Sequence, residues 1–119
     1  MLRYHGAWRI TVVARSSGFA QRAVVRGPHG VPRVLAGRAG AALEVDEESW
    51  TLALEHRPQG PGGWRPNLRT TPGPVTERDG VRSQLLTSND RHWPGKPLEY
   101  VNLVLRLDQS AGPVMPPCD

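Results

Sequence analysis

Apolar and polar residues alternate with a period of two in three segments of the chain. These segments cover residues 8–15, 50–57 and 100–107. In the second of them Trp50, Leu52 and Leu54 share one side, opposite Thr51 and Glu55. Successive side chains of a strand point to opposite faces of a sheet, so the pattern predicts strands that cover a core on one face and meet solvent on the other.

Shorter strand-like patterns, separated by turn residues, fill the gaps between these segments. They cover residues 19–26, 43–45, 64–69 and 81–87. Residues 46–49, three acidic residues and a serine, are expected to turn the short strand at 43–45 into the strand that begins at Trp50. The dipeptide Asp79–Gly80 is a strong turn signal in front of residue 81. Residues 64–69 are expected to pair with the Trp50 strand across a glycine-rich turn.

Six or seven strands at this spacing predict an all-β fold. We expect a small antiparallel β-sandwich of the immunoglobulin-like or C2-like kind, with a small barrel as the alternative. A helix at residues 35–43 is disfavoured, because Gly37 and Gly40 each cost it about 1 kcal/mol relative to alanine. Longer loops are expected at residues 27–39, 70–80 and 89–97.

The length of 119 residues indicates one β domain, expected at residues 1–108 and followed by a Pro-rich tail at 109–119. Thirteen glycines and 12 prolines disfavour a helical bundle. The single cysteine, Cys118, has no partner for an internal disulfide. No apolar signal core opens the chain, and no apolar run approaches a membrane span. A cytoplasmic location is therefore the expectation.

Motifs for catalysis, cofactors or metals are not found in the sequence. Phosphate-binding, zinc-protease, dithiol and serine-hydrolase patterns are all missing, so no catalytic, cofactor or metal residue is predicted. Glu55 and His56 are neighbours on a strand and point to opposite faces, which disfavours their direct cooperation. His56 continues the apolar face and is expected to be a hydrogen-bonded core or rim residue. An enzyme with Glu55, His56 and Arg57 at the mouth of a barrel remains a third possibility.

One acidic group resembles a candidate cation site. Its members are Glu44, Asp46, Glu47 and Glu48. Hard cations require several converging oxygen ligands, but the glycine and the alternating ligand spacing of a calcium loop are missing here. A solvated hairpin turn is the preferred interpretation.

Arginine dominates the positive charge. Basic residues exceed acidic ones by 15 to 11, and every basic residue except Lys96 is an arginine. Five arginines occupy the expected outward positions of strands: Arg9, Arg15, Arg22, Arg26 and Arg106. On neighbouring strands they would form a basic face for a polyanion, such as single-stranded nucleic acid or an anionic lipid. The alternative is an ordinary solvated face with ion pairs to Glu55 or Asp108.

Aromatic residues beside cations form a second signal. They lie in the expected loops as Trp64–Arg65 and Arg91–His92–Trp93, with Tyr100 nearby. Exposed tryptophan next to arginine is typical of recognition surfaces. In the alternative interpretation the two loop tryptophans fold back as lids over the core. Trp8 and Trp50 lie in the apolar register of strong strands and are expected in the core.

The favoured hypothesis is a non-catalytic interaction or assembly module. It would dock a protein partner, or a second copy of the chain, through the loops at residues 58–69 and 89–97. A polyanion-binding module that uses the arginine face is the alternative function.

Overall fold

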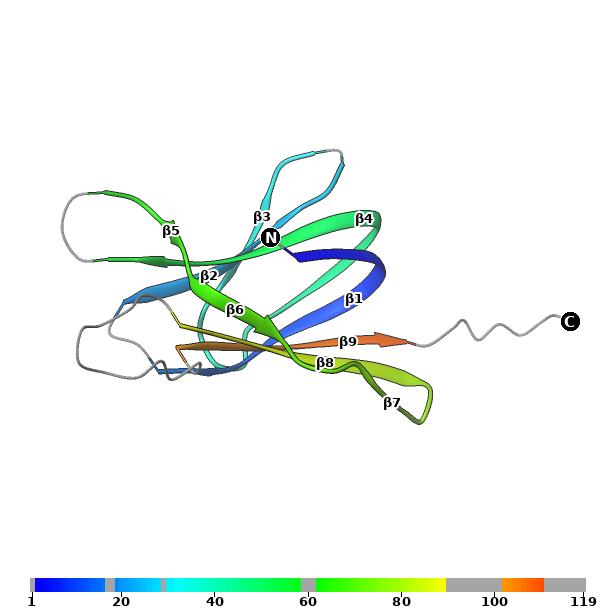
Figure 1. The fold of residues 1–119 in the computed structure, drawn as a ribbon. Coiled ribbons are helices and arrows are strands. Elements are labelled where there is room, and N and C mark those ends of the chain that lie inside the picture. Colours follow the sequence, from blue (N-terminus) through cyan, green and yellow to red (C-terminus); the bar gives the residue numbers. More distant parts are fainter. Residues whose placement is uncertain (1, 17–18, 29, 59–61, 90–101, 111–119) are drawn as a thin grey trace, which may run out of the picture.

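The computed structural model describes residues 2–16, 19–28, 30–58, 62–89 and 102–110 (Figure 1). They form one sheet of nine antiparallel strands, and no helix occurs in these ranges. The strands are β1 (Leu2–Arg15), β2 (Ala20–Arg26), β3 (Arg33–Ala36), β4 (Ala42–Arg57), β5 (Arg65–Pro66), β6 (Leu68–Pro72), β7 (Thr76–Arg78), β8 (Val81–Asn89) and β9 (Leu103–Ser110). The prediction of an all-β fold is confirmed.

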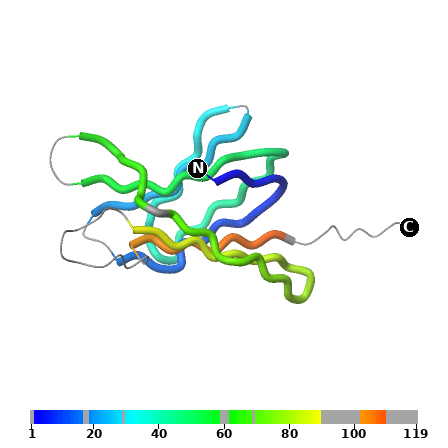
Figure 2. The backbone as a smooth tube through the Cα atoms, viewed as in Figure 1, coloured from blue at the N-terminus to red at the C-terminus, as the bar shows by residue number. Residues whose placement is uncertain are grey.

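The strands follow the order β3-β2-β4-β1-β9-β8-β6. β5 pairs with β4, and β7 pairs with β8. Figure 2 shows how the chain runs through β5 and β6 from the β4 side of the molecule to the β8 side. The sheet curls into a sandwich-like fold and does not close into a barrel, so the sandwich interpretation holds and the barrel alternative does not.

Alternating residues of β1, β4 and β9 build most of the core. Their inward side chains are almost completely buried: Ile10 and Val12 on β1, Trp50, Leu52 and Leu54 on β4, and Leu103, Leu105 and Leu107 on β9. Burial of each aliphatic side chain of this size stabilises the fold by roughly 1.5–3 kcal/mol. The period-two pattern therefore identified the core face of each strand correctly.

The predicted turn at residues 46–49 is wrong, because β4 runs unbroken through this acidic segment. Glu44 lies opposite Arg9 of β1, and Asp46 lies opposite Ala7. Val45 between them is buried, whereas both carboxylate residues are exposed. An acidic run can continue a strand when its polar side chains reach solvent and its apolar residue faces the core. The acidic residues therefore line one strand instead of surrounding a hairpin turn.

Segments expected to be loops contain short edge strands. β3 lies within residues 27–39, and β7 lies within residues 70–80. The Asp79–Gly80 turn that joins β7 to β8 is confirmed, with φ angles of 53° and 78°. Positive φ at both positions suits the right-handed twist of a hairpin. β9 continues to Ser110, opposite Val81, so the sheet extends two residues beyond the expected domain boundary at 108.

Candidate functional site

Trp64 lies just before β5 and is half-buried. The guanidinium carbon of Arg22 lies 4.3 Å from the centroid of its ring, which is a cation–π contact. Arg22 comes from β2, far away in the sequence, and Arg65 beside the tryptophan is exposed. The arginine that contacts this ring is therefore not its neighbour in the chain.

Glu55 holds Arg22 in this position. The two residues are register partners on β4 and β2. Nε and Nη2 of Arg22 both lie 2.7 Å from Oε1 of Glu55, and the side chains are 25% and 15% exposed. An ion pair that is partly shielded from water fixes a long side chain better than a fully exposed one. We call Arg22, Glu55 and Trp64 the Trp64 cluster.

One further arginine lies on the same face of the sheet as the Trp64 cluster. Arg57 follows Glu55 by two positions on β4 and therefore shares its face of the sheet. Arg57 and Arg65 are both exposed. Arg22 and Arg57 thus place two guanidinium groups beside one carboxylate on this face, whereas Arg65 is the register partner of His56 and belongs to the other face of β4. The surface combines a held aromatic ring with an excess of positive charge.

The second aromatic segment cannot be placed beside this one. Arg91, His92, Trp93 and Tyr100 lie outside the described residues. Of the predicted partner-binding residues, the structure therefore places only Trp64 and Arg65.

The five arginines of the expected basic face divide between two parts of the sheet. Arg22 and Arg26 lie on β2, whereas the other three lie on β1 and β9, and β4 separates the two groups. All of them are exposed except Arg22, which is half-buried. Arg22 pairs with Glu55, and Arg106 Nε donates a hydrogen bond to Asp108 Oδ2 at 2.9 Å. Ion pairs to these two carboxylates are what the solvated-face interpretation predicts.

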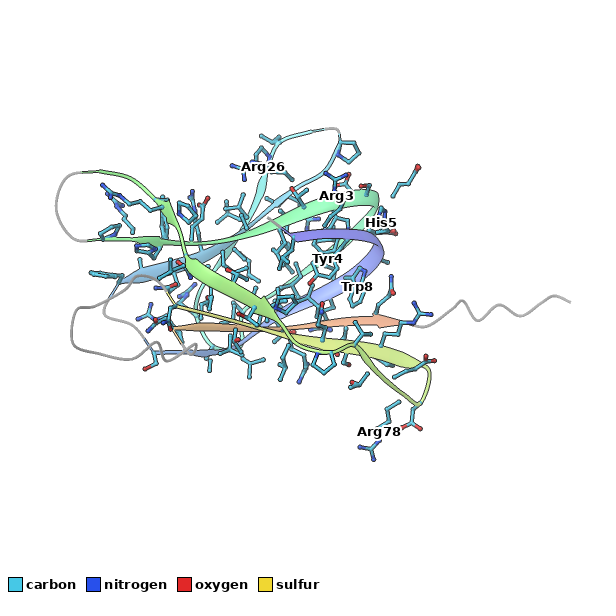
Figure 3. The ribbon with its side chains drawn as sticks, viewed as in Figure 1. Arg3, Tyr4, His5, Trp8, Arg26 and Arg78 are labelled. Carbon is cyan, nitrogen blue, oxygen red and sulfur yellow. The ribbon has the colours of Figure 1, made fainter. Side chains whose placement is uncertain are left out.

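One basic residue that the sequence analysis passed over lies near this face. Arg3 on β1 and Arg26 on β2 are both register partners of Thr51 on β4. Both arginines are exposed and lie on the same side of the molecule (Figure 3). The period-two alternation covers the chain only from residue 8 onward, so it does not indicate the strand around Arg3.

His56 belongs to a buried polar network. Its Nδ1 donates to Oδ1 of Asn67 at 2.9 Å, because that oxygen can only accept. Nδ2 of Asn67 donates to Gln21 Oε1 at 3.0 Å and to Ser88 Oγ at 3.1 Å. Ser88 in turn donates to the carbonyl oxygen of Leu103. We call Gln21, His56, Asn67 and Ser88 the Asn67 network.

The Asn67 network is part of the core. His56 is 4% exposed and Ser88 is completely buried. The Ser88 hydroxyl proton is used in a backbone hydrogen bond, which leaves this serine without the arrangement of an activated nucleophile. Within the described part of the chain, no three His, Cys, Asp or Glu residues are grouped so that they could hold a metal ion.

A groove of about 660 Å³ lies over β8 and β9, away from the Trp64 cluster. Residues of β1, β6, β8 and β9 and of the segment between β6 and β7 line it, among them Val13, Pro74, Ser83, Leu85, Thr87 and Arg106. Its lining is mostly apolar. Val13 and Leu85 are apolar residues at outward positions of strands, and such positions are the sequence signal that could have indicated the groove.

The sequence matches no protein-family model, and no curated protein shows significant similarity to it. Among the residues that the structure describes, no helix has the length and apolar character needed to cross a membrane. Function must therefore be argued from the surface itself.

Proposed function

We propose that this protein is a non-catalytic interaction module that docks a partner protein through the Trp64 cluster. The observation that supports this most directly is the half-buried tryptophan, whose ring is held by Arg22, which is itself held by Glu55. Tryptophan and arginine dominate the energetically important positions of protein interfaces. A ring already fixed before binding loses little conformational entropy when the partner covers it.

The charge around the cluster indicates the partner's chemistry. Arg57 is exposed on the same face of β4, and Arg65, which directly follows Trp64 in the chain, is also exposed. Guanidinium groups pair with carboxylates in a bidentate geometry, so the partner should present aspartate or glutamate residues around an apolar pocket that receives Trp64. Arg57 and Arg65 would then form the polar rim of the interface.

The polyanion alternative has weaker support. Exposed Arg3 and Arg26 on either side of Thr51 favour it. The pairing of Arg22 with Glu55 counts against it, because Nε and Nη2 of this arginine both contact the carboxylate and its charge is partly neutralised. Several phosphate contacts would make binding fall steeply with salt concentration.

Affinity capture from the source cell, followed by titration with the purified captured protein, tests the proposal. We expect Trp64→Ala to weaken the binary complex by about 30-fold, the effect of losing about 2 kcal/mol at an interface hot spot. Arg65→Ala should weaken it by a smaller factor. The matched control is Arg78→Ala, an exposed arginine on the distant β7–β8 hairpin (Figure 3), which should leave the affinity unchanged.

Two outcomes would contradict this function. In the first, the purified partner binds the Trp64→Ala variant as tightly as the native chain. In the second, single-stranded oligonucleotides or anionic vesicles bind in a salt-sensitive manner, and Arg3→Ala and Arg26→Ala abolish that binding while Trp64→Ala does not. The second result would favour the polyanion alternative instead. Light scattering over a concentration series shows whether the partner is a second copy of the chain.

A further inference from the structure

We infer that the groove over β8 and β9 is a binding site for a small amphipathic carboxylate, with its alkyl chain on Leu85 and its head group on Arg106. This inference does not depend on the proposed role of the Trp64 cluster, since the two sites share no residue.

The floor of the groove is aliphatic and open to solvent. Val13 is 44% exposed and Leu85 is 48% exposed, although each lies on a strand of the sheet. Val13 is the extra residue at the register shift between Val12 and Ala14 of β1, and it lines the groove together with Leu85. Pro74 adds further apolar surface. Such surface gains stability when an alkyl chain removes it from water.

The charge among the described residues that line the groove is positive. Arg106 is the only charged residue among the described residues that line it. Its Nε donates to Asp108 Oδ2 at 2.9 Å, while Oδ1 of Asp108 accepts a hydrogen bond from Ser83 Oγ at 2.6 Å. Asp108 is therefore fixed from both sides and orients the guanidinium group, although it does not itself line the groove.

The remaining donors of Arg106 suit a carboxylate. The contact between Arg106 and Asp108 is made through Nε, and the arginine side chain is 52% exposed, so its two terminal nitrogens can be reached from solvent. These nitrogens form the end of the planar guanidinium fork, which can hold both oxygens of one carboxylate. An anion with an apolar body would thus satisfy the donors and the aliphatic floor together, whereas a cation would meet like charge.

The volume limits the size of the ligand. About 660 Å³ lies within the range of roughly 300–1,000 Å³ that is typical of small-molecule sites. The described lining residues include no aromatic side chain on which a ring would stack. A straight alkyl chain of medium length is therefore a better fit than an aromatic acid.

Titration of the full chain with octanoate, followed by amide chemical shifts and kept below micelle formation, tests the inference. The shifts should map to β8, β9 and the β1 segment around Val13. Arg106→Gln should weaken octanoate binding by about tenfold or more, because a hydrogen bond to a charged group contributes about 1.5–3 kcal/mol. Leu85→Gln should also weaken it and keeps the fold, since this side chain is exposed.

Two comparisons make the result decisive. Octyltrimethylammonium has the same alkyl chain with the opposite charge and should not bind at the groove. Arg78→Gln is the matched control for Arg106→Gln and should bind octanoate like the native chain. Equal binding of the two surfactants, octanoate binding that ignores the Arg106→Gln change, or no binding of octanoate at all would overturn the inference.

Discussion

Trp50 and His56 lie on the same face of β4 and are both almost completely buried, yet their surroundings are opposite in character. Trp50 stacks on Tyr4 with ring centroids 5.0 Å apart and planes at 23°. Trp8 meets the edge of Tyr4 at 5.4 Å. We call these three rings the aromatic cluster. His56 also stacks on a ring, that of Phe19 at a centroid distance of 5.8 Å, but it belongs in addition to the Asn67 network, whose members are joined by hydrogen bonds with defined donors.

The two regions are stabilised by different physical effects. The aromatic cluster depends mainly on the removal of apolar area from water, an effect without strong directionality. The indole Nε1 of Trp50 donates one hydrogen bond, to the carbonyl oxygen of Gly6. The Asn67 network depends on the direction of each donor, and both Nδ2 protons of Asn67 are used. Loss of side-chain volume should therefore lower the stability of the fold most in the aromatic cluster, whereas loss of a hydrogen-bond donor should lower it most in the Asn67 network.

The largest effect is expected from Trp50→Ala. Loss of a fully buried indole typically costs about 3–5 kcal/mol, because apolar contacts are lost and a cavity remains. The free energy of unfolding, measured by urea denaturation, should fall by about that amount. Trp50→Phe keeps most of the apolar area and should cost clearly less. If both variants lost the same stability, the hydrogen bond to Gly6 rather than buried area would dominate this region.

Asn67→Asp should produce the next largest effect, with almost no change in size. An ionised carboxylate at this position has no protons to donate to Gln21 and Ser88, and leaving buried polar groups without partners costs about 1–3 kcal/mol each. We expect the free energy of unfolding to fall by about 2–4 kcal/mol. Asn89→Asp, on the next buried asparagine in β8, is the control for a charge introduced at this end. An Asn67→Asp variant as stable as the native chain would contradict the assigned network.

The aromatic cluster and the Asn67 network also differ in how far the sequence predicted them. Trp8 and Trp50 lie in long period-two segments, so strand geometry alone predicted that both side chains point inward. In the structure Trp50 is 1% exposed, and Trp8 packs against the core while staying partly exposed. Asn67 lies between β5 and β6 in a segment rich in glycine and proline. Asn67 can form its hydrogen bonds only because the fold places this segment between β4 and β8. No local sequence pattern predicts that placement.

The candidate site was also predicted only in part from the sequence. The pair Trp64–Arg65 was recognised from its composition, but the guanidinium group on the ring comes from Arg22. That contact depends on the register of β2 against β4, which places Arg22 opposite Glu55. The groove likewise joins outward residues of strands whose order the sequence left open. Alternation predicts which way a side chain points, whereas strand order decides which side chains meet.

Tyr4 differs from the two tryptophans of the aromatic cluster because its phenol can titrate, so its contribution to stability depends on pH. Tyr4 donates to Gln84 Oε1 at 2.8 Å, and burial raises the pKa of Tyr4 from 10.0 to about 12. Between these pH values the unfolded chain loses the phenol proton while the folded chain keeps it. The stabilising effect is therefore complete below pH 10 and is lost as the pH rises towards 12, by about 2–3 kcal/mol at most.

Urea denaturation at a series of pH values measures this loss. Tyr4→Phe should lower the free energy of unfolding near neutral pH by about 1 kcal/mol through the missing hydrogen bond. Above pH 10 the native chain should lose stability faster than the variant, and the two curves should converge and then cross, because the loss of about 2–3 kcal/mol exceeds the initial difference of about 1 kcal/mol. Parallel curves over this range would show that Tyr4 does not carry the raised pKa.

The smallest effect on stability is expected from Trp64→Ala. A half-buried ring and one cation–π contact together contribute about 1 kcal/mol. A double-mutant cycle with Arg22→Met should give a coupling of about 0.5–1 kcal/mol between the two side chains. Trp64 is thus expected to resemble Trp50 in chemistry but not in its effect on unfolding. A loss as large as that of Trp50→Ala would make Trp64 a lid of the core, and the docking function proposed for its cluster would then lose its main support.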